Sequence, residues 1–84
     1  MSRTALQRPA AELTRIAPEA NQARFYRLAL WPDLFGGCAL VREWGRIGQP
    51  GRLRRDLYES EDQAADALER IERAKTRRGY RAAS

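Results

Sequence analysis

Residues 38–58 read CALVREWGRIGQPGRLRRDLY, and this stretch carries the strongest signal for the fold. It holds two runs of alternating side chains, 38–47 and 52–58, which are joined by the tetrapeptide GQPG. Alternation with a period of two is typical of β-strands. Proline followed by glycine suits the two central positions of a type II turn. The stretch therefore predicts a β-hairpin whose turn is centred on Pro50 and Gly51.

Two more strands are predicted on the N-terminal side of this hairpin. Residues 24–31 (RFYRLALW) are rich in the aromatic and aliphatic side chains that strands favour. Pro-Asp and Gly-Gly pairs within 32–37 indicate a turn between this run and the hairpin. Residues 11–17 form a shorter candidate strand, which Pro18 ends because proline cannot continue a ladder of backbone hydrogen bonds.

The segment after the hairpin predicts one α-helix. Ser60 is a favourable N-cap, and Gln63 completes a capping-box pattern. Apolar residues recur every three or four positions over 64–71, which gives the helix one apolar stripe. Gly79 is placed to adopt the left-handed conformation that ends many helices, so Tyr80 would fold back against the helix end. The predicted fold is α+β, with a single antiparallel β-sheet of three to five strands packed on one C-terminal α-helix.

The length allows a single small domain of 84 residues. Residues 1–10 mix polar side chains with Pro9 and show no periodicity. We expect them to form a flexible N-terminal arm, with the folded domain over 11–84.

The helix needs an apolar surface to pack on, because a helix of this length is marginal when isolated. We expect that surface to be the aliphatic face of the sheet, which carries Tyr26, Leu28, Val41, Leu53 and Leu57. The opposite face would then stay uncovered. It carries the basic and tryptophan side chains of the hairpin, namely Arg42, Trp44, Arg46, Arg52 and Arg54. Because these come from adjacent strands, they are expected to be neighbours.

A tryptophan among arginines on an open sheet suits nucleic acid. The flat indole of Trp44 can stack on a sugar or a base. The arginines can neutralise phosphates and fix the register of the bound strand. The alternative is that Trp44 is partly buried and stacked by an arginine for local stability.

The overall charge agrees with a polyanionic partner. The chain has 16 Lys and Arg residues against 11 Asp and Glu, which gives a net charge of +5. Lys75 is the only lysine, so nearly all the positive charge is on arginine, whose planar guanidinium pairs well with phosphate. A genome biased toward arginine codons would also raise this count, so composition leaves both explanations open.

The composition argues against several function classes. The chain contains no histidine, the commonest general base and metal ligand. Cys38 is the only cysteine, which excludes an internal disulfide and favours a reducing, cytoplasmic compartment. No apolar run reaches the roughly 20 residues of a membrane helix. We therefore expect a protein that is not an enzyme, uses no cofactor or metal, and has neither a membrane nor a small molecule as partner.

The run EWGRIG at 43–48 resembles the signature of the WGR domain family. Further blocks resemble the family in the same order, namely Asn21 with Arg24-Phe25-Tyr26 near the start, Gly51, Ser60 and Ala65 in the middle, and KTRRGY at 75–80. The resemblance covers about residues 13–80, nearly the whole chain. Several blocks in order make it far more specific than a bare Trp-Gly-Arg.

The resemblance implies a DNA-binding role. WGR domains occur within DNA-dependent poly(ADP-ribose) polymerases, where they contact DNA near strand breaks and relay that contact to neighbouring domains. By residue match, Trp44 would pack against the nucleic-acid backbone, and Arg46 would bind DNA or contact other domains. Gly45 would keep the strand surface open between them, because a side chain there would crowd the helix-facing side.

The resemblance also bears on what is absent from this sequence. Small bacterial proteins that consist of little more than a WGR domain are similar in length to this chain. The 84 residues leave no room for a polymerase catalytic domain or zinc fingers, so no ADP-ribosyltransferase activity is expected.

Three functional hypotheses follow from the sequence. The first is a non-catalytic nucleic-acid-binding module, with DNA expected rather than RNA, that binds backbone or ends. Its candidate residues are Arg42, Trp44, Gly45, Arg46, Arg52, Arg54 and Lys75. The second is a protein-interaction or regulatory module that uses the same face together with Leu34 and Phe35. The third is a structural domain whose basic charge reflects only codon usage.

Overall fold

A computed structural model describes residues 10–83, and it contains five strands and one α-helix. In chain order the elements are β1 (Ala11–Ala17), a 3-10 turn (Pro18–Ala20), β2 (Gln22–Pro32), β3 (Cys38–Arg46), β4 (Arg52–Tyr58), α1 (Glu61–Arg77) and β5 (Arg81–Ala82). The predicted N-terminal arm, except for Ala10, lies outside the described residues.

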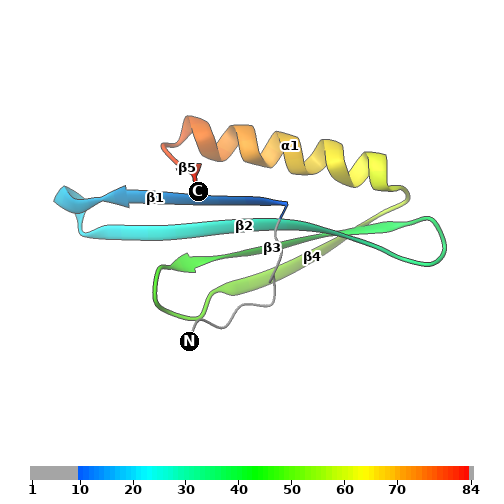
Figure 1. Cartoon of the computed structure of the whole chain (residues 1–84), viewed down its shortest axis with the longest axis horizontal. Coiled ribbons are helices and arrows are strands. Elements are labelled where there is room, and N and C mark those ends of the chain that lie inside the picture. The colour runs from blue at the N-terminus through cyan, green and yellow to red at the C-terminus, as the bar shows by residue number, and fades with distance from the viewer. Residues whose placement is uncertain (1–9, 84) are drawn as a thin grey trace.

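The strands form a single antiparallel sheet in the order β4-β3-β2-β1-β5, and α1 lies over one of its faces (Figure 1). The predicted α+β fold is confirmed. The bounds of β1 and β4 are those that the sequence predicts, and β3 ends one residue early, at Arg46. β2 is longer than predicted. The left-handed Asn21 (φ 53°) turns the chain directly after the 3-10 turn, so Gln22 already pairs with Ala17.

The loop between β2 and β3 fixes how these two strands align. The Asp33 carboxylate accepts hydrogen bonds from the backbone N–H groups of Phe35 (2.8 Å) and Gly37 (2.9 Å). This closes the five-residue loop and pairs Pro32 with Cys38. Every later pair follows from that register.

The turn between β3 and β4 is not the one that the sequence predicts. The positive φ angle belongs to Gly48 (φ 89°), and the Gln49 N–H donates to the Arg46 carbonyl at 3.2 Å. The predicted turn centred on Pro50 and Gly51 is therefore wrong. Gly51 instead precedes β4, where a Cβ atom would lie 2.6 Å from the Trp44 carbonyl oxygen.

The face that α1 covers also differs from the prediction. Tyr26 pairs with Trp44, and Leu30 pairs with Leu40, so these side chains share the face beneath α1. Val41 lies on the opposite face with Ala29 and Ala39. The core under the helix consists of Ala11, Leu13, Tyr26, Leu28, Leu40, Ala67, Leu68 and Tyr80.

The prediction that α1 covers the face opposite Trp44 is thus wrong. Alternation within each strand was assigned correctly, but alignment between strands depends on the loops. The register of the β2–β3 hairpin places Leu28 opposite Arg42, so the aliphatic side of β2 shares a face with the Trp44 side of β3. Leu53 and Leu57 pair with Glu43 and Ala39, on the face away from α1.

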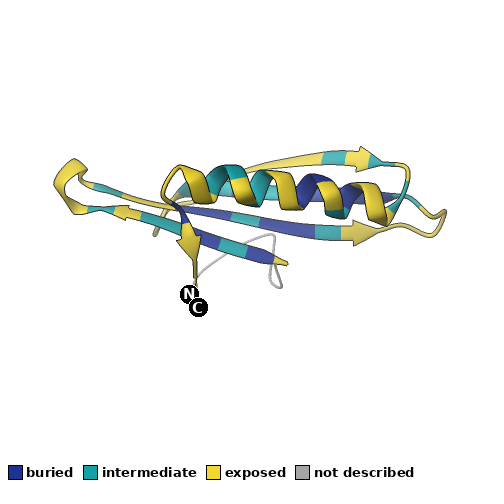
Figure 2. Ribbon diagram, turned by 90° about the horizontal axis from the view of Figure 1, so that it is seen from above, coloured by how far each residue is buried: buried dark blue, intermediate teal, exposed yellow. Residues whose placement is uncertain are grey.

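The ends of α1 lie at the predicted residues, although the Gln63 side chain bonds one residue before the N-cap and so does not complete the expected capping box. The Ser60 hydroxyl accepts from the Gln63 N–H at 3.1 Å, and the Gln63 side chain accepts from the Glu59 N–H at 3.2 Å. Gly79 adopts φ 98°, and the Tyr80 N–H donates to the Lys75 carbonyl at 3.1 Å. Tyr80 is thereby buried against the sheet, and the buried residues of the molecule gather along β2, β3 and the underside of α1 (Figure 2).

The crowding at Gly51 makes a testable prediction. A methyl group there would meet the Trp44 carbonyl oxygen at 2.6 Å and the Phe25 ring at 2.7 Å, and the backbone atom cannot move aside. We expect Gly51→Ala to lower the free energy of unfolding by about 1–3 kcal/mol, as overpacking commonly does. Urea denaturation measures this. The control is Gly36→Asn, because Gly36 has φ 89° but nothing within 4 Å, and asparagine tolerates that conformation. Equal stability of Gly51→Ala and the parent would contradict the packing described here.

Candidate nucleic-acid interface

A stacked pair of aromatic rings marks the centre of the candidate site. Tyr26 on β2 and Trp44 on β3 are directly paired, and their rings stack with centroids 5.8 Å apart and planes inclined by 19°. Trp44 is partly buried and packs against the core under α1. The alternative hypothesis assumed that Trp44 is partly buried and stacked by an arginine. The partial burial is observed, but the residue that stacks on Trp44 is Tyr26.

Lys75, in the last turn of α1, lies over the Tyr26 ring of this pair. Its Nζ atom is 4.4 Å from the centroid of the Tyr26 ring and 5.5 Å from that of Tyr80. Burial lowers the pKa of Lys75 below the ordinary lysine value, and the charges of Arg78 and Arg42 lower it further. The ammonium group is thus held by ring faces rather than by a carboxylate of residues 10–83.

Further arginines come from the next row of the sheet. Arg24 pairs with Arg15 on one side and with Arg46 on the other, so β1, β2 and β3 each contribute one guanidinium. The Arg15 guanidinium donates to the Gln22 side chain at 2.7 Å, which orients it across the end of the sheet.

Two of these side chains, Arg15 and Arg24, and the end of α1 line an open cationic pocket. It has a volume of about 430 Å³ and is lined by Arg15, Arg24, Lys75, Arg78 and Tyr80. None of its four cations forms an ion pair with a carboxylate of residues 10–83. Like charges held together repel one another, and a bound anion would relieve that repulsion. The pocket therefore suits a phosphate or another compact anion.

The prediction that Arg42 stays uncovered is wrong, because its guanidinium is bonded within the protein. Its guanidinium donates to the Asp56 carboxylate at 2.8 Å and to the Tyr26 hydroxyl at 3.3 Å. Its Nε atom is buried and has no hydrogen-bond partner in the described part of the chain. The β2–β3 register places Arg42 and Tyr26 on the same face of the sheet as Trp44, beneath α1. Arg42 therefore helps to hold the Tyr26 ring in place.

The remaining candidates lie in different places. Arg46 is exposed at the end of β3, and Arg52 is exposed opposite Trp44 on β4. Arg54 is exposed but donates to Asp56 at 3.1 Å. Gly45 faces away from α1, where a Cβ would lie 3.5 Å from the Phe25 ring and 3.0 Å from Gly51. The expectation that a side chain at Gly45 would crowd the helix-facing side is wrong, because the alternation places Gly45 opposite to Trp44.

The sequence does not predict three cations of the pocket, namely Arg15, Arg24 and Arg78. Arg78 stands in the KTRRGY block, but only the folding back of the chain at Gly79 turns it toward the sheet. Arg24 and Arg15 require the registers of two hairpins. One usable signal is Asn21, because its left-handed conformation after the 3-10 turn fixes the β1–β2 register and so places Arg15 opposite Arg24.

The described residues thus form a small α+β domain with a cationic pocket at one end of its sheet. In residues 10–83 no helix is long and apolar enough to cross a membrane. The same residues contain no group of three or more His, Cys, Asp or Glu side chains that could hold a metal ion.

The chain belongs to the WGR domain family, whose model matches residues 10–84. It is 39% identical over 67 residues to the "Uncharacterized protein y4dW" of Sinorhizobium fredii (strain NBRC 101917 / NGR234). That alignment covers 80% of this chain but 33% of the relative, so the chain spans about a third of the length of the curated relative it matches. No solved structure matches the chain significantly. Neither match indicates a catalytic family.

The ion pairs of Asp56 predict how stability depends on pH. Burial alone would raise the pKa of Asp56, but hydrogen bonds from Arg54 and Arg42, with their charges, outweigh it and lower the pKa below the usual value. The stabilisation is therefore fully present above the unfolded pKa of about 4 and is lost as the pH falls through the folded pKa. Urea midpoints should show Asp56→Asn less stable than the parent at pH 7, with the difference shrinking below about pH 4.

Asp66→Asn is the matched control, since Asp66 is exposed on α1 and forms no ion pair among residues 10–83. It should stay close to the parent at every pH. A difference between Asp56→Asn and the parent that does not change with pH would contradict the ion-pair account.

Proposed function

We propose that this protein is a non-catalytic nucleic-acid-binding module, with DNA as the expected ligand. It binds the phosphate backbone through the surface formed by the cationic pocket, Trp44 and Arg46. The observation that carries the proposal is the pocket itself, in which four cations surround a volume of about 430 Å³ beside the Tyr26–Trp44 stack.

Each part of this surface has a distinct task. The guanidinium groups of Arg15, Arg24 and Arg78 donate in a planar fork that matches phosphate oxygens, and Lys75 adds a compact charge. The exposed part of the Trp44 ring offers a flat surface to the adjacent sugar or base. Because these contacts reach phosphate and sugar rather than base edges, we expect little sequence preference.

The arginines of the hairpin extend the positive surface beyond the pocket. Arg46 lies in the row of Arg24, and Arg52 lies beside Trp44 at the edge of the sheet. A backbone that passes over the pocket would meet these side chains next. If about four phosphates are neutralised, the logarithm of the binding constant should fall with the logarithm of salt concentration with a slope of about −4.

The family supports the same reading. The chain belongs to the WGR domain family, and the resemblance to the WGR domains of DNA-dependent poly(ADP-ribose) polymerases implies DNA contact by Trp44 and Arg46. The pocket adds residues from β1, β2 and α1 to that pair, so the proposed surface is larger than the WGR motif alone.

The proposal predicts that Arg24→Ala weakens nucleic-acid binding. Removing one charge-assisted phosphate contact should lower affinity by roughly tenfold and reduce the salt slope by about 1. Fluorescence anisotropy measures both quantities with labelled intact duplex DNA, nicked duplex DNA, single-stranded DNA and single-stranded RNA. The strongest of the four probes names the ligand class.

Arg70→Ala is the matched control because Arg70 is exposed on α1, lines no part of the pocket and carries the same charge. Arginine replacements test the site better than Trp44→Ala does, since Trp44 also packs against the core. Equal losses for Arg24→Ala and Arg70→Ala would mean that net charge, not the pocket, causes binding.

Lys75 predicts a second, pH-dependent effect. A bound phosphate favours the charged ammonium, but the pKa of Lys75 is lowered by burial and by the neighbouring arginines. Affinity should therefore decline as the pH rises through that lowered pKa, and Lys75→Arg should keep its affinity to higher pH. Anisotropy titrations from neutral to alkaline pH test this. The parent and Lys75→Arg both contain Tyr26 and Tyr80, so these tyrosines cannot cause a difference between the two pH profiles. Parallel pH profiles of the parent and Lys75→Arg would contradict a direct contact by Lys75.

The alternative function is that of a protein-interaction module, and one observation favours it. Leu34 and Phe35 at the tip of the β2–β3 hairpin are 96% and 94% exposed. Large apolar side chains in such positions are common anchors of protein interfaces. In this case binding to nucleic-acid probes would be feeble and insensitive to Arg24→Ala, and association with a protein would depend little on salt.

A further inference from the structure

Strand β4 leaves one edge of the sheet open. The sheet order begins with β4, whose only neighbour among residues 10–83 is β3. The strand lies at the margin of the sheet, beyond α1, and is mostly exposed along its length (Figure 2). An open edge presents unpaired backbone donors and acceptors to any strand of compatible sequence.

The sequence of β4 is complementary to itself. When two copies of RLRRDLY are paired antiparallel about Arg55, Leu53 of one copy faces Leu57 of the other. In the same register Arg54 faces Asp56. Because the arrangement is symmetric, each of these pairs occurs twice. The outermost pair is Arg52 with Tyr58.

Contacts between the facing side chains would stabilise this pairing. Leu53 and Leu57 are 53% and 80% exposed on the face away from α1, so pairing would remove apolar surface from water. The side chain of Arg54 is 63% exposed, and it already contacts its own Asp56. Apolar and opposite-charge pairs across strands both stabilise a sheet.

The neighbouring registers lose both leucine pairs, because Leu53 in one register and Leu57 in the other then faces Arg55. A shift by two residues in one direction opposes Arg54 to Arg54, and a shift in the other opposes Asp56 to Asp56. A shift by one residue would turn one sheet over, so the face that α1 covers in one copy would continue into the uncovered face of the other. The register about Arg55 contains one unfavourable contact, between the two Arg55 side chains at the symmetry axis, which keeps the association weak.

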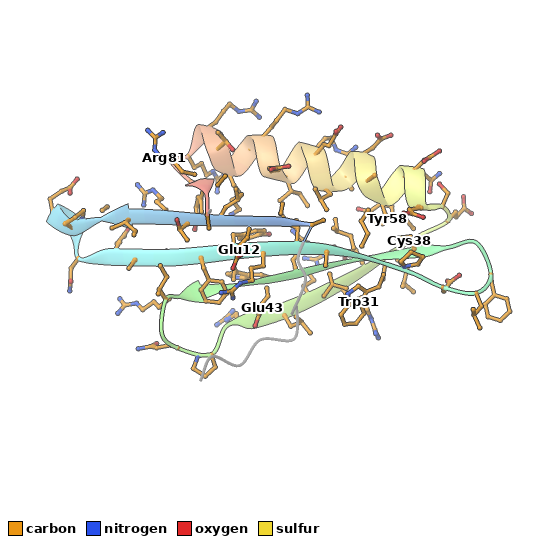
Figure 3. The ribbon with its side chains drawn as sticks, in the orientation of Figure 1. Glu12, Trp31, Cys38, Glu43, Tyr58 and Arg81 are labelled. Atoms are coloured by element: carbon orange, nitrogen blue, oxygen red, sulfur yellow. The ribbon has the colours of Figure 1, made fainter. Side chains whose placement is uncertain are left out.

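The apolar surface near β4 supports the same interface. Trp31, Ala39 and Leu57 form one row across β2, β3 and β4, and Trp31 is 43% exposed. Trp31 and Glu43 lie on the side of the sheet away from α1 (Figure 3). In the paired arrangement this row would continue into Leu53 of the second copy.

We propose that β4 pairs with β4 of a second copy of this chain, centred on Arg55, to form a symmetric dimer with one continuous sheet. The two-fold axis is perpendicular to the sheet, so both helices and both cationic pockets stay on the same side. This interface shares only Arg52, in its outermost pair, with the proposed nucleic-acid surface, and its test does not depend on nucleic-acid binding.

Disulfide trapping tests the register. In this arrangement the two copies of residue 55 face each other with Cα atoms roughly 4.5–5.5 Å apart, within reach of a disulfide. The two copies of residue 54 are offset along the strands and lie roughly 8 Å apart, beyond that reach. Mild oxidation should therefore link Arg55→Cys into a dimer on a non-reducing gel, while Arg54→Cys and the parent, whose Cys38 is buried, stay monomeric. Equal linking of both variants, or of neither, would overturn the register.

Sedimentation equilibrium with complementary variants tests the dimer itself. The parent mass should rise with concentration from 9.6 kDa toward twice that value. Leu53→Lys and Leu57→Glu replace exposed side chains, so each should fold but stay monomeric at concentrations where the parent dimerises. Their mixture should regain dimer, because lysine then faces glutamate and the remaining leucines still pair. A parent that stays monomeric up to near-millimolar concentration would overturn the proposal and leave the edge to a strand of another protein. A mixture that stays monomeric would overturn the pairing of Leu53 with Leu57.

Discussion

The ring of Tyr26 joins the parts of this domain that make up the candidate site. Trp44 stacks on it at 5.8 Å, Tyr80 meets it edge-on at 6.3 Å, and Lys75 lies 4.4 Å from its centroid. Arg42 donates to its hydroxyl at 3.3 Å. β2, β3 and the C-terminal end of α1 are thus tied at one point. The cationic pocket opens beside that point, and the Tyr26 ring contacts two of its lining side chains, Lys75 and Tyr80.

Much of the fold follows from local patterns that the sequence displays. Alternation predicts the observed bounds of β4, because turn residues flank this strand on both sides. Ser60 and Gly79 define the ends of α1 through short-range hydrogen bonds and a left-handed φ angle. The β3–β4 turn was misplaced because Pro50 and Gly51 look favourable in isolation. Tertiary crowding by Trp44 and Phe25 is what requires glycine at position 51.

The candidate site was only partly predictable, because it depends on how separate segments align. Trp44 and Arg46 stand in one motif and share a strand face, so the sequence identifies them. The neighbours that α1 and β1 bring to them, such as Lys75 and Arg15, depend on the strand registers and on the reversal at Gly79. For the same reason the sequence alone could not decide whether α1 covers the Trp44 face or the opposite one. A five-residue loop closed by Asp33 decides it.

The most direct measurement is an NMR titration of the ¹⁵N-labelled protein with the duplex or single-stranded oligonucleotide that binds best. The chain has two tryptophans, and the indole N–H of each gives a separate signal from opposite faces of the sheet. We expect the signals of the Trp44 indole and of the amides around Arg24, Lys75 and Tyr80 to shift, while the Trp31 indole signal stays in place. Shifts confined to the Trp31 indole and the β2–β3 loop, or no shifts at all, would contradict this expectation.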